Sequence, residues 1–152
     1  MYDFTIKQIP SQLVLYRQGN CAHAEIGKLC GEILPAVFTY IREAGAEPGG
    51  PPFCRYAAWR EQDCDLEAGF PLLAPIAAEP PLRIGQLGGG RALFTLHRGP
   101  YDKLPEAHAA AKEWLARNGM AANGTPWETY ITDPAMFEDP NDWLTELYYP
   151  VR

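Results

Sequence analysis

The chain has 152 residues and a formal net charge of −6, and its length predicts one globular domain with its own hydrophobic core. The acidic balance and the lack of a basic cluster argue against direct binding to nucleic acid or to an anionic membrane surface. No apolar run reaches the ~18 residues of a membrane span and no signal-peptide pattern opens the chain, so we expect a cytoplasmic protein.

The first predicted elements are two strands and a helix. Asp3 to Pro10 has a strand pattern, and so has the segment LVLYRQG from Leu13 to Gly19. From Ile26 to Ala44, apolar residues recur at steps of three and four, which predicts an amphipathic helix that ends before Gly45. We expect Pro35 to kink this helix.

Two strands complete the first half of the chain. They are PFCRY, from Pro52 to Tyr56, and EAGFP, from Glu67 to Pro71. Both are short, contain aromatic residues and lie between Gly, Pro and Asp residues, as is typical of strands in hairpins. After the leading strand from Asp3 to Pro10, the first half therefore has the order strand, helix, strand, strand.

The second half repeats this order. LFTLHRG, which begins at Leu93, matches LVLYRQG, and PWETY, Pro126 to Tyr130, matches PFCRY. ELYYP, Glu146 to Pro150, matches EAGFP. A second amphipathic helix is predicted from about Pro105 to Gly119.

The duplication predicts one α+β domain built from two βαββ repeats, of about residues 1–80 and 81–152. Two such repeats, related by a pseudo-twofold axis, would form an antiparallel sheet covered on one face by the two helices. The opposite face would then be open to a ligand.

The four cysteines are Cys21, Cys30, Cys54 and Cys64, and their spacing contains no CxxC pair. A structural zinc site needs four ligands at recognisable spacings. We therefore expect thiols in a reducing compartment, with no bound metal and no cofactor.

Alternation along the two middle strands divides their side chains between two faces. The set with Phe53, Arg55, Trp59 and Trp127 is the more apolar, so we assign it to the helix-covered core. This leaves Cys54, Tyr56, Glu128 and Tyr130 on the open face. A carboxylate among tyrosines would bind an apolar cation. If its pKa were raised, it could instead act as a general base on water. The third alternative is that Glu128 is a solvated surface residue with no functional role.

Three further aromatic residues are candidate ligand contacts. Tyr101 follows a Gly-Pro turn that could hold its ring over the open face or staple the start of the second helix. Trp59 lies beside a hairpin loop, where it could contact a ligand at the rim, and Tyr148 lies within ELYYP.

Other titratable residues have structural interpretations. Glu67 and Glu146 precede the closing prolines, where each could pair with an Arg or bind backbone donors. His97 and His108 have no Ser, Cys or Asp at a triad spacing, so nucleophilic catalysis is not expected.

Five elements in order, PFCRY, DLEAGFP, LHRGPY, PWETY and TELYYPV, resemble the GyrI-like small-molecule-binding domain. This family also supplies the effector-binding half of multidrug-responsive and AraC-type transcription regulators. The resemblance spans nearly the whole chain and implies a curved sheet with a ligand groove near the twofold axis. It places the family's acidic residue at Glu128 and implies that Tyr56, Tyr101 and Tyr130 contact the ligand.

The resemblance implies three functions. The first is binding of hydrophobic, cationic small molecules for sequestration or sensing. The second is hydrolysis of electrophilic compounds such as cyclopropanoids, with Glu128 as the base, and the third is an interaction that inhibits DNA gyrase. Because strand-like sequence begins at Asp3, we expect a domain without the helix-turn-helix segment of the regulators, which would not act as a transcription factor by itself.

Overall fold

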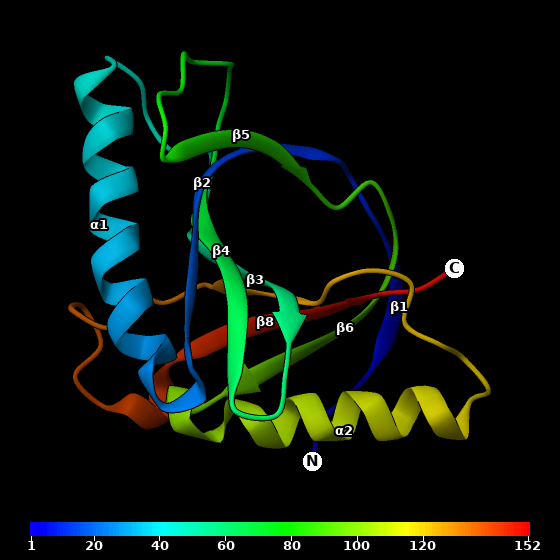
Figure 1. The fold of residues 1–152 in the computed structure, drawn as a ribbon. Helices are drawn as coiled ribbons and strands as arrows, with labels where there is room; N and C mark the ends of the chain where they lie inside the picture. Colours follow the sequence, from blue (N-terminus) through cyan, green and yellow to red (C-terminus); the bar gives the residue numbers. More distant parts are fainter. The chain divides into compact units, whose positions relative to one another are not determined.

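The computed structural model describes residues 1–152, which form two compact units. One unit consists of residues 11–89, and the other combines residues 1–10 with residues 90–152. Two α-helices and eight strands, each antiparallel to its partners within its unit, confirm the predicted α+β fold class (Figure 1).

The unit of residues 11–89 is a four-stranded sheet with one helix. Its strands pair in the order β3, β4, β2, β5, and α1 runs beside β2 and β4 (Figure 1). Its elements are β2 (Gln12–Ala22), α1 (Ile26–Glu43), β3 (Phe53–Trp59), β4 (Asp63–Pro71) and β5 (Leu82–Leu87).

The second unit has the same plan. Its strands pair in the order β1, β6, β8, β7, and α2 lies against β6 and β8 (Figure 1). Its elements are β1 (Thr5–Ile9), β6 (Gly90–Arg98), α2 (Leu104–Arg117), β7 (Trp127–Tyr130) and β8 (Leu144–Pro150). The N-terminal strand β1 therefore belongs to the unit that contains the C-terminal half of the chain.

The apolar stripe of α1 faces the sheet as predicted, with Cys30, Ile33, Val37 and Ile41 buried. The helix continues past Pro35 as one element of 18 residues. On β2, Gly19 allows the close approach of this helix, because a Cβ there would lie 2.7 Å from the side chain of Leu29.

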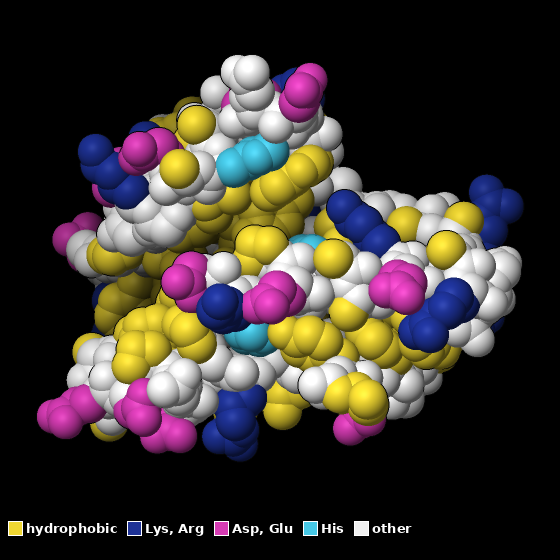
Figure 2. Space-filling model, turned by 90° about the horizontal axis from the view of Figure 1, so that it is seen from below, with side chains coloured by type: hydrophobic (Ala, Val, Ile, Leu, Met, Phe, Trp, Pro, Cys, Tyr) yellow, Lys and Arg dark blue, Asp and Glu magenta, His cyan; other side chains and the backbone are white.

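The α2 helix also matches its prediction. Leu104, Ala107, Ala111 and Leu115 are buried, and the chain leaves the helix at Gly119, whose φ of 63° suits glycine. Figure 2 shows acidic and basic side chains interspersed on the outer side of this helix. Four charged residues of this helix are all exposed: Glu106, Lys112, Glu113 and Arg117.

The structure corrects the repeat alignment of the first strand. The spacing between the starts of β2 and β6 is the same as that between the starts of α1 and α2, and as that between the short 3₁₀ turns that precede the two helices. In this common register the counterpart of Leu93 is Leu15, whereas the match of LVLYRQG to LFTLHRG makes it Leu13. The sequence match is thus displaced by two positions. Such a shift preserves the face of every side chain in a strand, which is why the pattern does not reveal the error.

Neither helix is long and apolar enough to cross a membrane. The four cysteines form no disulfide. No group of three or more His, Cys, Asp or Glu side chains comes together in a way that could hold a metal ion.

Candidate functional site

Glu128 lies on the face of its sheet that α2 covers, and only 2% of it is exposed. Its cross-strand partner on β8 is Leu147, which packs with Ala107, Ala111 and Leu115 of the helix. Tyr130 shares this face, because it pairs with Thr145, two positions from Leu147. The assignment of Glu128 and Tyr130 to a face away from the helices is therefore wrong.

The error has a physical cause. The choice between faces assumed that the more apolar set of side chains must point to the helix. In β7 both faces are buried: Trp127, on the face away from α2, is 5% exposed and stacks on Tyr148 with ring centroids 4.7 Å apart. Polarity along such a strand does not distinguish its two faces.

The Glu128 carboxylate is held by side-chain hydrogen bonds. The Tyr130 hydroxyl donates to Oε1 at 2.7 Å, and Nε2 of His108 donates to Oε2 at 2.6 Å. The second ring nitrogen of His108, Nδ1, accepts from the Tyr149 hydroxyl at 2.7 Å. The helix and β8 thus each contribute one side chain, and β7 contributes two, to one polar network, which we call the Glu128 network: His108, Glu128, Tyr130 and Tyr149.

Aromatic rings adjoin the Glu128 network. The Tyr101 ring centroid lies 5.4 Å from that of Tyr130 and 4.8 Å from that of Trp143. Tyr101 is the first residue of the short 3₁₀ turn that precedes α2, where it could staple the start of the helix as expected. Its ring lies against Tyr130, on the helix-covered side of the sheet, and not over a face away from the helices. The rings give the carboxylate apolar, polarisable neighbours of the kind that favour organic cations.

Burial and negative charge raise the phenol pKa of two tyrosines here. Burial and the charges of Asp133 and Glu128 raise the pKa of Tyr101 to about 12, and burial and Glu128 raise that of Tyr149. Both phenols therefore stay protonated, as donors, at neutral pH.

These pKa shifts predict alkaline destabilisation. A phenol whose pKa is higher in the folded than in the unfolded chain stabilises the fold fully below about pH 10 and loses that contribution as the pH rises towards 12. We expect the denaturant midpoint to fall over this interval, and to fall less in Tyr101→Phe. Absorbance at the phenolate band, compared between the two proteins, reports the titration of Tyr101, and a pKa near 10 would contradict the prediction.

One buried polar group near the Glu128 network lacks a hydrogen-bond partner. It is the hydroxyl of Thr145, which is fully buried on β8 opposite Tyr130. A buried hydroxyl without a hydrogen-bond partner reduces stability and is uncommon, so such a group calls for a functional explanation.

In the other unit, Cys54 and Tyr56 lie on the face that α1 covers. Tyr56 pairs with Leu66 of β4, Leu66 pairs with Gly19, and Gly19 faces the α1 side chains of Leu29 and Ile33. Cys54 is fully buried and Tyr56 is 8% exposed. Their assignment to a face away from the helices is wrong for the same reason as in β7, since Phe53 on the opposite face is also fully buried.

Trp59 shares a face with Tyr56, although simple alternation places the two on opposite faces. A bulge interrupts β3 between Tyr56 and Ala58, so that Trp59 pairs with Cys64. Trp59 is 55% exposed, stacks on His23 with centroids 4.0 Å apart, and meets the Tyr56 ring edge-on.

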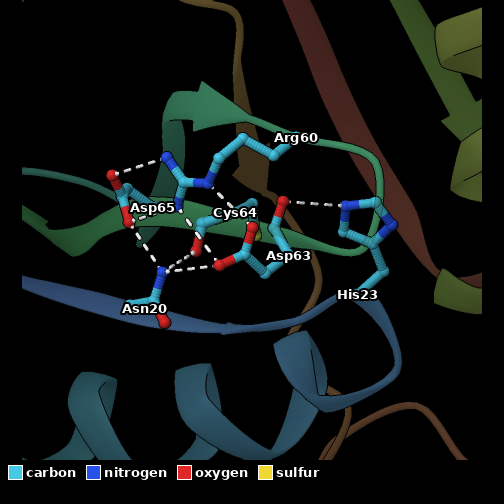
Figure 3. A network of polar contacts seen from close by, with 6 residues as sticks. All are labelled: Asn20, His23, Arg60, Asp63, Cys64 and Asp65. Atoms are coloured by element: carbon cyan, nitrogen blue, oxygen red, sulfur yellow. Dashed lines mark hydrogen bonds and ion pairs between the residues drawn. The ribbon is translucent and has the colours of Figure 1, made fainter.

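The hairpin that carries Trp59 is fixed by polar contacts (Figure 3). Arg60 donates to Asp63 at 2.7 Å and to Asp65 at 2.8 Å, and Asn20 of β2 donates to both carboxylates. Nε2 of His23 lies 3.0 Å from the Asp63 carbonyl oxygen. Hydrogen bonds from Arg60 and Asn20 lower the pKa of both aspartates, so the network stays intact at neutral pH.

Tyr148 is not part of the Glu128 network. It lies on the face away from α2, where its hydroxyl donates to Glu146 at 2.9 Å. Of the predicted site residues, Glu128, Tyr130 and Tyr101 thus come together, Cys54, Tyr56 and Trp59 lie in the other unit, and Tyr148 lies on the opposite face of its own sheet.

The sequence prediction missed His108 and Tyr149. A search for triad spacings does not find His108, because its partner Glu128 comes from a strand 20 residues later. A signal was present, since His108 lies four positions after Leu104 and one after Ala107, within the buried stripe of its helix. A polar side chain on a buried stripe needs a buried partner.

The comparisons with known proteins agree with this fold. The family model described as GyrI-like small molecule binding domain matches residues 2–152. The chain is similar to the crystal structure of the EcmrR C-terminal domain, with a TM-score of 0.89 and 23% identity over 100% of this chain and 98% of that one. Against EcmrR in its DNA complex the TM-score is 0.87 at 23% identity, and the match covers 99% of this chain and 57% of that one.

More distant structures share the fold. SAV2435 bound to tetraphenylphosphonium has a TM-score of 0.68 at 10% identity, covering 99% of this chain and 94% of that one. A hydrolase from Listeria innocua has a TM-score of 0.63 at 15% identity, covering 98% and 91%. No curated protein sequence matches the chain.

Proposed function

Because the chain belongs to the GyrI-like small-molecule-binding domain family, we propose that it binds hydrophobic organic cations, with Glu128 as the residue that selects for positive charge. The observation that carries this proposal is a carboxylate only 2% exposed beside the rings of Tyr130 and Tyr101. A buried carboxylate attracts a cation far more strongly than one in water, and flat aromatic rings add cation–π contacts.

Two further observations support a cationic ligand. The structurally similar SAV2435 is bound to tetraphenylphosphonium, a cation with four phenyl rings. Burial, Asp133 and Glu128 together raise the pKa of Tyr101 to about 12, so the acidic side chains create a negative potential at this ring that would attract a cation.

The test is a calorimetric titration with tetraphenylphosphonium. We expect Glu128→Gln, which keeps the shape of the side chain and its capacity to accept from Tyr130, to weaken binding about tenfold or more. The matched control is Glu113→Gln, whose carboxylate is on the outer side of α2 with 69% of its side chain exposed, and which should bind as the wild type does. Equal affinity of wild type and Glu128→Gln, with both folded by circular dichroism, would contradict the proposal.

A second candidate function is hydrolysis of an electrophilic small molecule such as a cyclopropanoid. The observation that favours it is the 2.6 Å contact between Glu128 and His108, because a carboxylate next to an imidazole can take and pass on a proton during attack by water. The test is product formation with a panel of such compounds. Under this function Glu128→Gln would abolish turnover but leave the compound bound, whereas a binder shows no product with either protein.

A further inference from the structure

The sheet face away from α2 carries a row of aromatic rings. Trp127 stacks on Tyr148 at 4.7 Å, and Phe94 lies 5.3 Å from Tyr148. At the β1 end of the row, the Lys7 ammonium lies 3.7 Å from the centre of the Phe94 ring. Beside the row on β8 lies Glu146, whose carboxylate accepts from the Tyr148 hydroxyl.

The equivalent face of the other unit contains a guanidinium. There Nε of Arg55 donates to Glu67 at 2.8 Å, and Nη1 donates to the backbone oxygen of Gln86 at 2.7 Å. The Arg55 guanidinium carbon lies 5.7 Å from the centre of the Tyr16 ring. Only 16% of each charged side chain in this ion pair is exposed.

The repeat relates the two faces residue by residue. Glu146 is the counterpart of Glu67, and Thr129 is the counterpart of Arg55, because each strand pair places these residues directly opposite each other. In the register that aligns β2 with β6, Phe94 is the counterpart of Tyr16. The carboxylate and the aromatic ring are therefore kept in the second unit, and the guanidinium is replaced by a threonine.

Glu146 consequently has no basic partner. Its contact is the 2.9 Å hydrogen bond from the Tyr148 hydroxyl. Two basic residues share this face of the sheet. The Lys7 ammonium lies over the Phe94 ring, and Arg98 of β6, which is opposite Leu144, is exposed and forms no ion pair with Glu146. The neighbour of Glu146 on β6 is Leu96, which is 44% exposed, and its neighbour on β7 is the short side chain of Thr129. The side chains directly opposite Glu146 on the two neighbouring strands are thus too short or too apolar to neutralise its carboxylate.

We propose that this face binds a small guanidinium compound, which would take the position that Arg55 occupies in the other unit. A planar guanidinium suits the site because it can donate two parallel hydrogen bonds to Glu146 while its face lies against an aromatic ring. An alkylammonium has neither property. This site is separate from the Glu128 network, which lies on the opposite face of the same sheet.

The experiment is an NMR titration with methylguanidinium, which is too small to depend on the hydrophobic contacts of the Glu128 network. We expect saturable shifts at the amides of Thr129, Glu146 and Tyr148, at least about tenfold weaker binding of methylammonium and of neutral N-methylurea, and a similar loss in Glu146→Gln. Glu113→Gln and Glu128→Gln should both bind as the wild type does. Shifts that do not saturate, or that persist in Glu146→Gln, would overturn the proposal.

A second variant tests the same site by filling it. Thr129→Arg restores the residue found in the first repeat, so its guanidinium should pair with Glu146, raise the thermal midpoint and weaken methylguanidinium binding about tenfold or more. Thr129→Gln, of intermediate length and without charge, is the matched control and should retain binding. Unchanged binding in a folded Thr129→Arg protein would contradict the assignment of Glu146 as the guanidinium site. Tetraphenylphosphonium affinity should be the same in the wild type, Glu146→Gln, Thr129→Arg and Thr129→Gln, which separates failure of this site from failure of the Glu128 proposal.

Discussion

Replacing Gly69 with alanine is expected to destabilise the folded chain by about 3 kcal/mol or more. Gly69 lies in β4 opposite Tyr16, and a Cβ at this position would overlap the carbonyl oxygen of Leu15 and lie 2.7 Å from the Cα of Tyr16. Both neighbours are backbone atoms of the adjacent strand, so no side-chain rotation relieves the clash. The two central strands of this unit would have to separate.

The measurement is urea denaturation followed by tryptophan fluorescence. Gly31→Ala is the matched control, because Gly31 lies on the exposed side of α1, where a Cβ would meet no neighbouring element within 4 Å. Replacing a helical glycine with alanine stabilises by roughly 0.5–1 kcal/mol. The same glycine-to-alanine change should thus lower the free energy of unfolding at position 69 and raise it at position 31. A Gly69→Ala protein as stable as wild type would show that β2 and β4 are not packed as described.

Replacing His108 with leucine is expected to cost about 3 kcal/mol of stability. The substitution removes the donor to Glu128 and the acceptor for Tyr149, in surroundings where Glu128 is 2% exposed. Removing one partner of a buried polar pair costs more than removing both, because the remaining charge or dipole keeps its desolvation penalty.

A double-mutant cycle tests this explanation. His108→Leu combined with Glu128→Leu should be more stable than His108→Leu alone, by about 1 kcal/mol or more, when both are measured by denaturant titration. If the stability effects of the two substitutions are instead additive, the 2.6 Å contact contributes no coupling energy, and the residues of the Glu128 network do not stabilise the fold cooperatively.

The helices could be predicted from the sequence because each has a single buried stripe. The period that predicted the first helix recovers its buried residues Cys30, Ile33, Val37 and Ile41, and the Pro105 and Gly119 signals place the ends of the second helix to within two positions. A surface helix has one solvent-exposed face and one buried face, so its hydrophobic periodicity shows directly which face is buried.

The faces of the middle strands could not be predicted in this way. Alternation correctly grouped Glu128 with Tyr130, but it gave no means to decide which group meets the helix, because both sides of β7 are buried. The bulge in β3 also moved Trp59 to the face of Tyr56, and one extra residue in a strand leaves no trace in a two-residue pattern.

Comparison of the two units shows that the polar residues of the Glu128 network occur in only one of them. In the aligned repeats, the counterparts of His108, Glu128 and Tyr149 are two cysteines and a phenylalanine, namely Cys30, Cys54 and Phe70. The imidazole, the carboxylate and the phenol are thus all absent from these positions of the first repeat. Glu128 is therefore the residue on which charge selection by this domain should depend.

The most direct test of this account compares two ions of the same shape and opposite charge. Tetraphenylphosphonium and tetraphenylborate each place four phenyl rings around one atom, so a difference between their affinities reports charge rather than size. We predict that the wild-type protein binds the cation at least about tenfold more tightly than the anion, and that Glu128→Gln removes most of this preference. Equal affinities in the wild type, or a preference that survives in Glu128→Gln, would contradict the central claim that Glu128 selects a cationic ligand.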